Sequence, residues 1–247
     1  MMKIDTLQRS IRFIFAFSIF YGYSSLKRGS FYLLSSLSFP LSLLFLLYII
    51  TKGSYLKYGI VGGVLSLITS VAITEIGDYV LFRKEIKLQD ILVATGITPL
   101  EYILGISLGN IIFSLPAIIV YIILGVLLAS LTLMQMLYLL GISILLMIGL
   151  SSFSFLISTY IRYTRYAWGV AGVLSVIFSV IPPLYYPYEV LGNFVYYLLP
   201  ILSTPAGIIA QNIAGLAEFK LDFLILLLLE TIIYTILAVK FARWSEV

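Results

Sequence analysis

Long apolar runs constrain the fold of this chain more than any other feature. Six runs of 18 to 31 residues, at 31–50, 59–82, 101–131, 133–161, 167–184 and 221–241, contain few charged side chains. An apolar helix of about 20 residues spans the ~30 Å hydrocarbon core of a bilayer. The sequence therefore predicts an all-α membrane protein with six transmembrane helices in one domain, residues 1–247.

Composition excludes several classes of protein. Hydrophobic residues make up 62% of the chain, whereas soluble domains contain about 45–50%. Cysteine and histidine are both absent, which excludes disulfides and thiolate metal sites and removes the commonest general base. The basic residues flank the apolar runs and form no single patch, so we expect no nucleic-acid partner. We assign no catalytic and no metal-binding residues.

Lys and Arg are distributed unevenly between the two sides of the predicted membrane. With the N-terminus in the cytoplasm, the cytoplasmic segments hold twelve of these residues, and the outer segments hold only Lys52, Lys57 and Lys220. Loops rich in Lys and Arg stay on the cytoplasmic side. We therefore expect a multi-pass protein of the cell membrane with both termini in the cytoplasm.

The first 28 residues have their own pattern. Apolar residues recur there at helical spacing, while Arg9 and Arg12 point away from them; the apolar positions are Ile4, Leu7, Ile11, Ile14 and Phe15. This pattern predicts an amphipathic helix on the inner membrane surface. The alternative is a leader that continues directly into the first span.

Residues 181–220 differ from the rest of the chain. Prolines interrupt this region at 182, 183, 187, 200 and 205 and leave two apolar stretches, 189–199 and 205–216, that are too short to cross a bilayer. Its tyrosines, at 185, 186, 188, 196 and 197, are typical of an aromatic belt at the membrane surface. We predict a re-entrant helical hairpin on the outer side, between spans 5 and 6.

The segment 83–100 is unusually polar for this chain. Within 85–95, Leu88, Ile91, Leu92 and Thr95 recur at helical spacing, opposite Lys84, Lys87 and Asp90. Gly96 is expected to end this helix, and Pro99 to begin the next one. The pattern predicts a short amphipathic cytoplasmic helix with a charged face for a soluble partner; the alternative is an ordinary solvated loop.

Three segments carry a resemblance to a known family. The first holds Glu85, Asp90, Thr95, Pro99, Glu101 and Gly105, although Lys87 and Leu88 replace a Gly-Thr pair of the family and Gly96 replaces a frequent Pro. The others are SFLISTYIRYTRYAWGV and the proline-rich VIPPLYYPYEVLGNFVYYLLPILSTPAGIIAQNIAG. In this order the chain resembles the ABC-2 type transporter permeases, the membrane subunits of ABC exporters.

The resemblance implies a function and a set of partners. A second permease subunit, identical or different, pairs with this one, and two copies of a separate ATP-binding subunit hold ATP and Mg. Each ATPase docks on the coupling helix after the second span, and the complex exports an amphipathic or hydrophobic substrate such as a drug-like compound, lipid or peptide. The implied coupling residues are Lys84, Glu85, Lys87, Asp90, Thr95, Pro99 and Glu101. Independently, the sequence has no G-x-x-x-x-G-K-[ST] phosphate loop and lacks that means of binding ATP.

Polar residues within the spans are candidates for a substrate pathway. Glu75 and Asp78 share one face of the second span, where they either pair with Arg83 or Arg162 or line a cytoplasmic vestibule. Ser66, Thr69 and Ser70 of the second span, with Ser175, Phe178 and Ser179 of the fifth, complete the candidate set. Small residues also serve at contacts between helices, which is the alternative for these positions.

Two other functions remain as alternatives. A secondary transporter is expected to show an internal repeat with interrupted helices in both halves, but the proline-rich break occurs only in the second half. A membrane-embedded enzyme acting on lipid needs a catalytic set, and the carboxylates of this chain are scattered along it.

Overall fold

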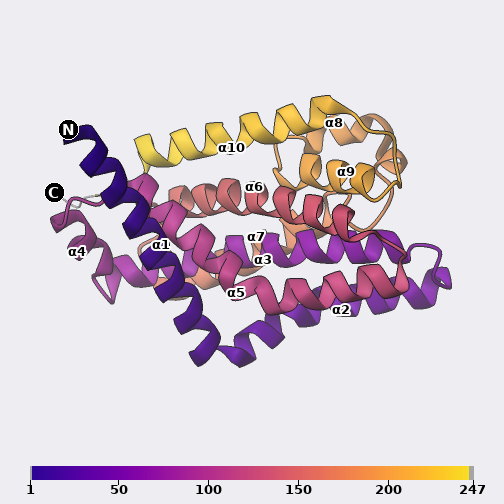
Figure 1. Ribbon diagram of the computed structural model, residues 1–247, viewed down its shortest axis with the longest axis horizontal. Coiled ribbons are helices and arrows are strands. Elements are labelled where there is room, and N and C mark those ends of the chain that lie inside the picture. The colour runs from indigo at the N-terminus through magenta and orange to yellow at the C-terminus, as the bar shows by residue number, and fades with distance from the viewer. Residues whose placement is uncertain (1, 245–247) are drawn as a thin grey trace.

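The computed structural model describes residues 2–244, apart from the side chains of residues 2–6, 28, 30 and 32. Helices without strands make up the regular structure of these residues (Figure 1). The helices are α1 (Met2–Arg28), α2 (Ser30–Thr51), α3 (Leu56–Lys84), α4 (Leu88–Ala94), α5 (Pro99–Leu128), α6 (Leu133–Ser158), α7 (Thr164–Val180), the 3-10 helix η1 (Tyr188–Phe194), α8 (Val195–Leu198), α9 (Ser203–Ile213) and α10 (Leu221–Phe241). The all-α prediction is confirmed for this part of the chain.

Five helices within 2–244 are long and apolar enough to cross a membrane: α2 from Leu33, α3, α5, α6 and α10. The chain is therefore a multi-pass membrane protein. The remaining predicted span corresponds to α7, which has 17 residues and a length of about 25 Å at 1.5 Å per residue. All six helices follow the long axis of the molecule, with α4 and both chain ends at one end and α8 and α9 at the other (Figure 1).

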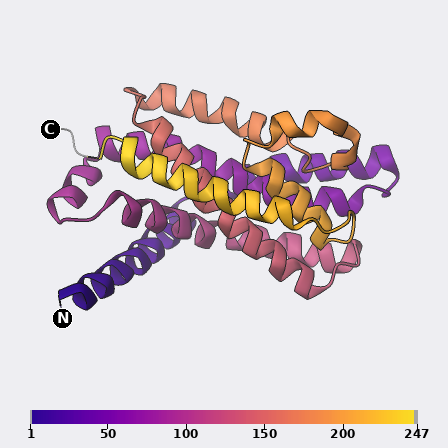
Figure 2. The same ribbon diagram turned by 90° about the horizontal axis from the view of Figure 1, so that it is seen from above.

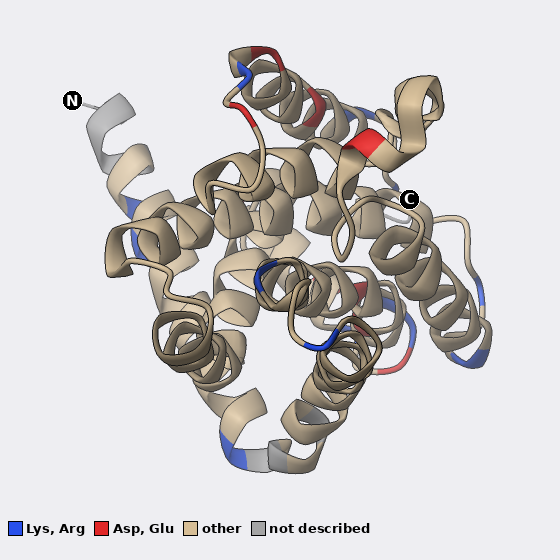
Figure 3. Ribbon diagram, turned by 90° about the vertical axis from the view of Figure 1, so that its right-hand side faces the viewer, with Lys and Arg blue, Asp and Glu red and all other residues tan. Residues whose placement is uncertain are grey.

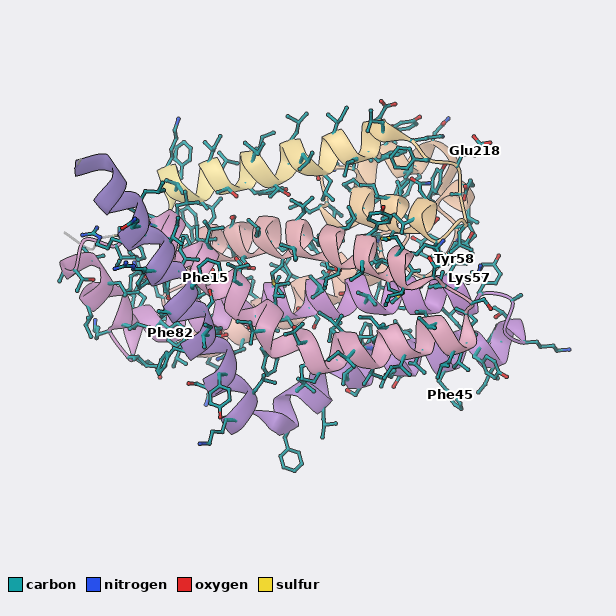
Figure 4. All side chains as sticks on the ribbon, viewed as in Figure 1. Phe15, Phe45, Lys57, Tyr58, Phe82 and Glu218 are labelled. Atoms are coloured by element: carbon teal, nitrogen blue, oxygen red, sulfur yellow. The ribbon has the colours of Figure 1, made fainter. Side chains whose placement is uncertain are left out.

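Helix α3 occupies the centre of the bundle, where it packs against α2, α5, α6 and α7. In its most apolar window 89% of the residues are buried, against 17% in α2 and 22% in α10. Side chains of the peripheral helices, such as Phe45 of α2, point away from the bundle (Figure 4). These outward faces are apolar, as expected for lipid contact, and charged residues occupy little of the ribbon (Figure 3).

Helix α1 crosses α5 obliquely at the end of the bundle that holds the termini (Figures 1 and 2). The crossing is close because α5 presents Gly105 and Gly109: the Ser18 hydroxyl donates to the Gly105 carbonyl at 2.9 Å, and a Cβ on Gly105 would lie 2.7 Å from the Phe17 ring. Leu7 and Phe15, on the predicted apolar face, are exposed. The helix itself is confirmed, and it ends at Arg28, before the first span.

The proline-rich region folds into η1, α8 and α9. Residues 203–211 of α9 are buried against α3, α6 and α10. Gln211 fixes the preceding loop, because its amide donates to the carbonyls of Pro183 at 2.6 Å and Tyr186 at 2.9 Å. Tyr196 and Tyr197 are exposed, as expected for an aromatic belt, whereas Tyr185 is buried in the bundle.

Candidate functional site

The polar segment between α3 and α5 forms a compact turn at the end of the bundle that holds the termini (Figure 1). Lys87 adopts a left-handed conformation (φ 60°) and starts α4 at Leu88, so the helix is shorter than the predicted 85–95. Gly96 (φ 73°) ends the turn, and Pro99 is the first residue of α5, both as predicted. A left-handed residue at 87 separates α4 from α3, which explains why the helix cannot begin at Glu85.

The inner face of α4 is fastened to other parts of the chain. The buried Gln89 amide donates to the carbonyls of Arg243 at 3.1 Å and Trp244 at 2.7 Å. The Trp244 indole in turn donates to the Ile97 carbonyl at 3.1 Å. Arg9 of α1 donates to the Gly96 carbonyl at 3.2 Å. The turn is therefore tied to α1 and to the residues that follow α10.

The outer face of α4 is a mixed apolar and charged surface. Ile86 and Ile91 are 53% and 59% exposed, and Lys87 and Asp90 beside them are also exposed. Ile91, which the spacing grouped with the buried Leu92, is therefore exposed, and the long-range bonds of Gln89 set the rotation of this short helix. We call Ile86, Lys87, Asp90 and Ile91 the α4 surface. Apolar side chains exposed among charges are typical of a surface that contacts another protein or a membrane.

The other expected coupling residues have different surroundings. Glu85 and Thr95 are exposed, whereas Lys84 and Pro99 are half-buried. Glu101 is buried and forms a capping box with Thr98: its carboxylate accepts from the Thr98 amide at 2.6 Å, and its own amide donates to the Thr98 hydroxyl at 3.3 Å. The T-x-x-E spacing of this pair is the sequence signal for such a cap.

An aromatic cluster lies beneath the turn. Tyr79 of α3, Tyr102 of α5 and Phe155 of α6 are fully buried and meet in edge-on contacts with ring centroids 5.0–5.9 Å apart. Trp244 joins them, with its ring 5.2 Å from that of Tyr102. Close-packed aromatic rings transmit displacement because they leave little free volume. The cluster therefore connects α4, through Trp244, to three central helices.

Glu75 and Asp78 have neutral hydrogen-bond partners. One carboxylate oxygen of the fully buried Glu75 accepts from the Asn110 amide at 2.7 Å and from the Ser151 hydroxyl at 2.9 Å. Asp78 accepts from the Tyr21 hydroxyl at 2.8 Å. Arg83, one of the expected pairing partners, donates to the carbonyls of Ser158 at the end of α6 and Ile161 in the α6–α7 loop. Glu75 thus joins α3, α5 and α6, and Asp78 joins α3 to α1.

The remaining pathway candidates lie mostly inside the bundle. Ser66, Thr69, Ser175, Phe178 and Ser179 are buried between helices of this chain. Ser70 is half-buried and lines a cavity of about 110 Å³ between α2 and α3, together with Ser35, Ser36, Val71 and Thr74. Ser66 and Thr69 lie on α3, and Ser175, Phe178 and Ser179 lie on α7, which packs against α3.

Gln89 and Trp244 are the residues of this site that the sequence does not reveal. A glutamine in a polar segment is typical of a solvated position, and its acceptors lie more than 150 residues away along the chain. Comparison with protein-family models, curated proteins and solved structures finds no match for this chain.

Proposed function

We propose that this chain is the permease subunit of an ATP-driven exporter, similar to the ABC-2 type permeases. The α4 surface carries the proposal: a short helix at the charged end of the bundle is fastened on one face and offers exposed isoleucines and charges on the other. A separate ATPase, with its bound ATP and Mg, docks on this surface. Two ATPases and a second permease subunit complete the transporter.

The order of the helices supports the proposed topology. An oblique helix (α1) precedes the first span, a fastened short helix (α4) follows the second, and the short helices η1, α8 and α9 precede the last. We propose that α7 is the fifth of six crossings and that α8 and α9 form a re-entrant hairpin on the outer side. Both termini and α4 then lie in the cytoplasm, the side to which most Lys and Arg residues are assigned.

The transport mechanism that we propose starts from the fastened face of α4. Movement of a docked ATPase displaces α4, and Gln89 passes the displacement to the end of α10 while Arg9 passes it to α1. Trp244 and the aromatic cluster extend it to α3, α5 and α6. The outward faces of α2 and α7 are largely exposed and apolar, which favours them as the surfaces where two permeases meet around a passage for amphipathic or hydrophobic cargo.

The test compares a variant with three substitutions in the α4 surface with a control variant that has matched substitutions at the other end of the bundle. The variant K87N/D90N/I91S keeps a residue that tolerates the left-handed conformation at 87. The control is K52N/D222N/L221S. Lys52 is also left-handed (φ 50°), Asp222 also lies in the first turn of its helix, and Leu221 is 55% exposed.

The measurement is co-purification with a P-loop ATPase encoded beside this chain, followed by ATP-dependent flux in vesicles. We expect the α4 variant to lose the ATPase and the flux while remaining folded, and the control to keep both. Unchanged complex formation and flux in the α4 variant would refute the proposed function. Flux by the purified chain without any ATPase would favour a secondary transporter instead.

A further inference from the structure

A basic cavity opens at the same end of the bundle as α4, and none of the residues of the α4 surface lines it. Its volume is about 310 Å³, and it lies where the end of α3, the α6–α7 loop and the residues after α10 meet; its lining consists of Arg83, Lys84, Thr159, Ile161, Arg162, Tyr163 and Arg243. Four of these are cations, and the described lining includes no carboxylate. The cavity therefore has a strongly positive potential.

The wall of the cavity is held in place by Arg83. Its side chain is 3% exposed, and its guanidinium donates to the carbonyls of Ser158 at 2.7 Å and Ile161 at 3.0 Å. These bonds fix the α6–α7 loop against α3. Arg162 follows directly in that loop and is exposed, as is Arg243. The site is thus a fixed wall with two accessible guanidinium groups.

The start of α7 adds to the positive potential. Tyr163, the residue before its first turn, lines the cavity, and neither a capping side chain nor an acidic residue is found there among the described residues. The N-terminal end of a helix carries partial positive charge and favours anions. Guanidinium groups beside a helix N-terminus are a combination that recognises phosphate oxygens.

Aromatic residues place this cavity at the level of lipid headgroups. Tyr160, Tyr163 and Tyr166 are 65–67% exposed around the α6–α7 loop, at the end of an apolar bundle. Exposed tyrosines at helix ends are typical of the membrane–water interface. Basic pockets at this depth bind anionic lipid headgroups. The volume is at the lower end of the ~300–1,000 Å³ of ligand sites, which suits a headgroup without its acyl chains.

We propose that this cavity binds a phosphate group, supplied by the headgroup of an anionic lipid. A soluble phosphate has the same recognition chemistry and is the other source to be distinguished. The inference depends on the membrane location of the chain and not on its proposed role as an exporter.

The experiment titrates the purified full chain in neutral detergent with short-chain phosphatidylglycerol and with phosphatidylcholine of the same chain length, and measures bound lipid by native mass spectrometry. The cavity variant is R162Q/R243Q. The control variant is R165Q/K240Q, which removes two exposed cations from the same end that do not line the cavity. Arg83 stays unchanged because it holds the loop.

We expect phosphatidylglycerol to bind more tightly than phosphatidylcholine. The cavity variant should lose roughly 30-fold in affinity, since each cation near an anionic headgroup contributes about a fivefold factor. The control should keep most of the affinity. Competition with inorganic phosphate identifies the source: no displacement of bound lipid supports the headgroup, and full displacement supports a soluble phosphate in the same cavity.

Three results would overturn the proposal. Equal weakening in both double variants would mean diffuse attraction to the basic end of the protein. Equal binding of phosphatidylcholine, whose headgroup also contains a phosphate but has no net charge, would mean that the net negative charge of the headgroup is not recognised. Unchanged lipid binding by R162Q/R243Q would mean that the lipid binds somewhere other than this cavity.

Discussion

Replacing Gln89 tests whether α4 is fastened to the rest of the bundle. In Gln89→Leu the side chain keeps a similar size at a buried position but becomes apolar, so its two hydrogen bonds to the carbonyls of Arg243 and Trp244 are lost. A hydrogen bond contributes about 0.5–1.5 kcal/mol, so the loss amounts to about 1–3 kcal/mol. The equilibrium between fastened and detached α4 then shifts by roughly 5- to 150-fold toward the detached state.

The assay is hydrogen exchange of peptides covering residues 87–98, measured by mass spectrometry in detergent. Amides that exchange through detachment of α4 should exchange roughly 5- to 150-fold faster in Gln89→Leu than in the wild type. Gln89→Glu, which also lacks a donor and adds a charge against two carbonyls, should exchange at least as fast. Gln135→Leu is the control, because Gln135 makes a similar bond to the Ile213 carbonyl at 2.8 Å at the other end of the bundle.

Wild-type exchange in Gln89→Leu would refute the argument that this side chain fastens α4. Faster exchange in Gln135→Leu as well would mean that the bundle is loosened as a whole. Gln89→Leu leaves the four residues of the α4 surface unchanged. If the proposed function also holds, this variant should therefore still bind the ATPase but transport less cargo per ATP hydrolysed.

Two further predictions concern the packing of the bundle. Gly109→Leu should lower the free energy of unfolding by about 1–3 kcal/mol through overpacking, because a Cβ there would lie 2.7 Å from the Tyr21 ring of α1. The control is Gly141→Leu, which has nothing within 4 Å of its added Cβ and should leave thermal unfolding in detergent unchanged. Equal effects of the two variants would contradict the close crossing of α1 and α5. The stability of Glu75→Gln should stay within about 1 kcal/mol of the wild type because glutamine keeps an acceptor oxygen, whereas Glu75→Leu should lose roughly 2 kcal/mol of stability. A Glu75→Leu variant as stable as the wild type would show that this carboxylate has no structural role.

Regular local patterns allowed much of this fold to be predicted. The apolar runs at 31–50, 59–82 and 221–241 correspond to α2, α3 and α10. A helix that crosses a bilayer needs about 20 apolar residues in a row, and such a run is visible in the sequence without any knowledge of the fold. The run at 167–184 extends further than α7, which ends at Val180. The prolines at 182 and 183 explain the difference, since neither has a backbone N–H with which to continue the helical hydrogen bonds.

The candidate site was less predictable because its contacts join distant parts of the chain. Helical spacing groups Ile91 with Leu92 on one face of α4, but it does not show that Leu92 is buried and Ile91 exposed, because the bonds from Gln89 to the residues after α10 set the rotation of the helix. Glu75 carries no local sign that its partners are Asn110 and Ser151 on two other helices. Glu101 is the exception, since its capping role follows from a four-residue motif.

One residue connects α4 to the basic cavity. The carbonyl of Arg243 accepts from Gln89, and the side chain of the same residue lines the cavity. If α4 fixes this backbone, it also fixes one of the two accessible guanidinium groups, and binding at the cavity and attachment of α4 must then favour each other by the same factor. Gln89→Leu should therefore weaken phosphatidylglycerol binding in the titration above, and phosphatidylglycerol should slow exchange in residues 87–98 of the wild type. Faster exchange in Gln89→Leu with wild-type lipid affinity would show that the two sites act independently, even though they share a residue.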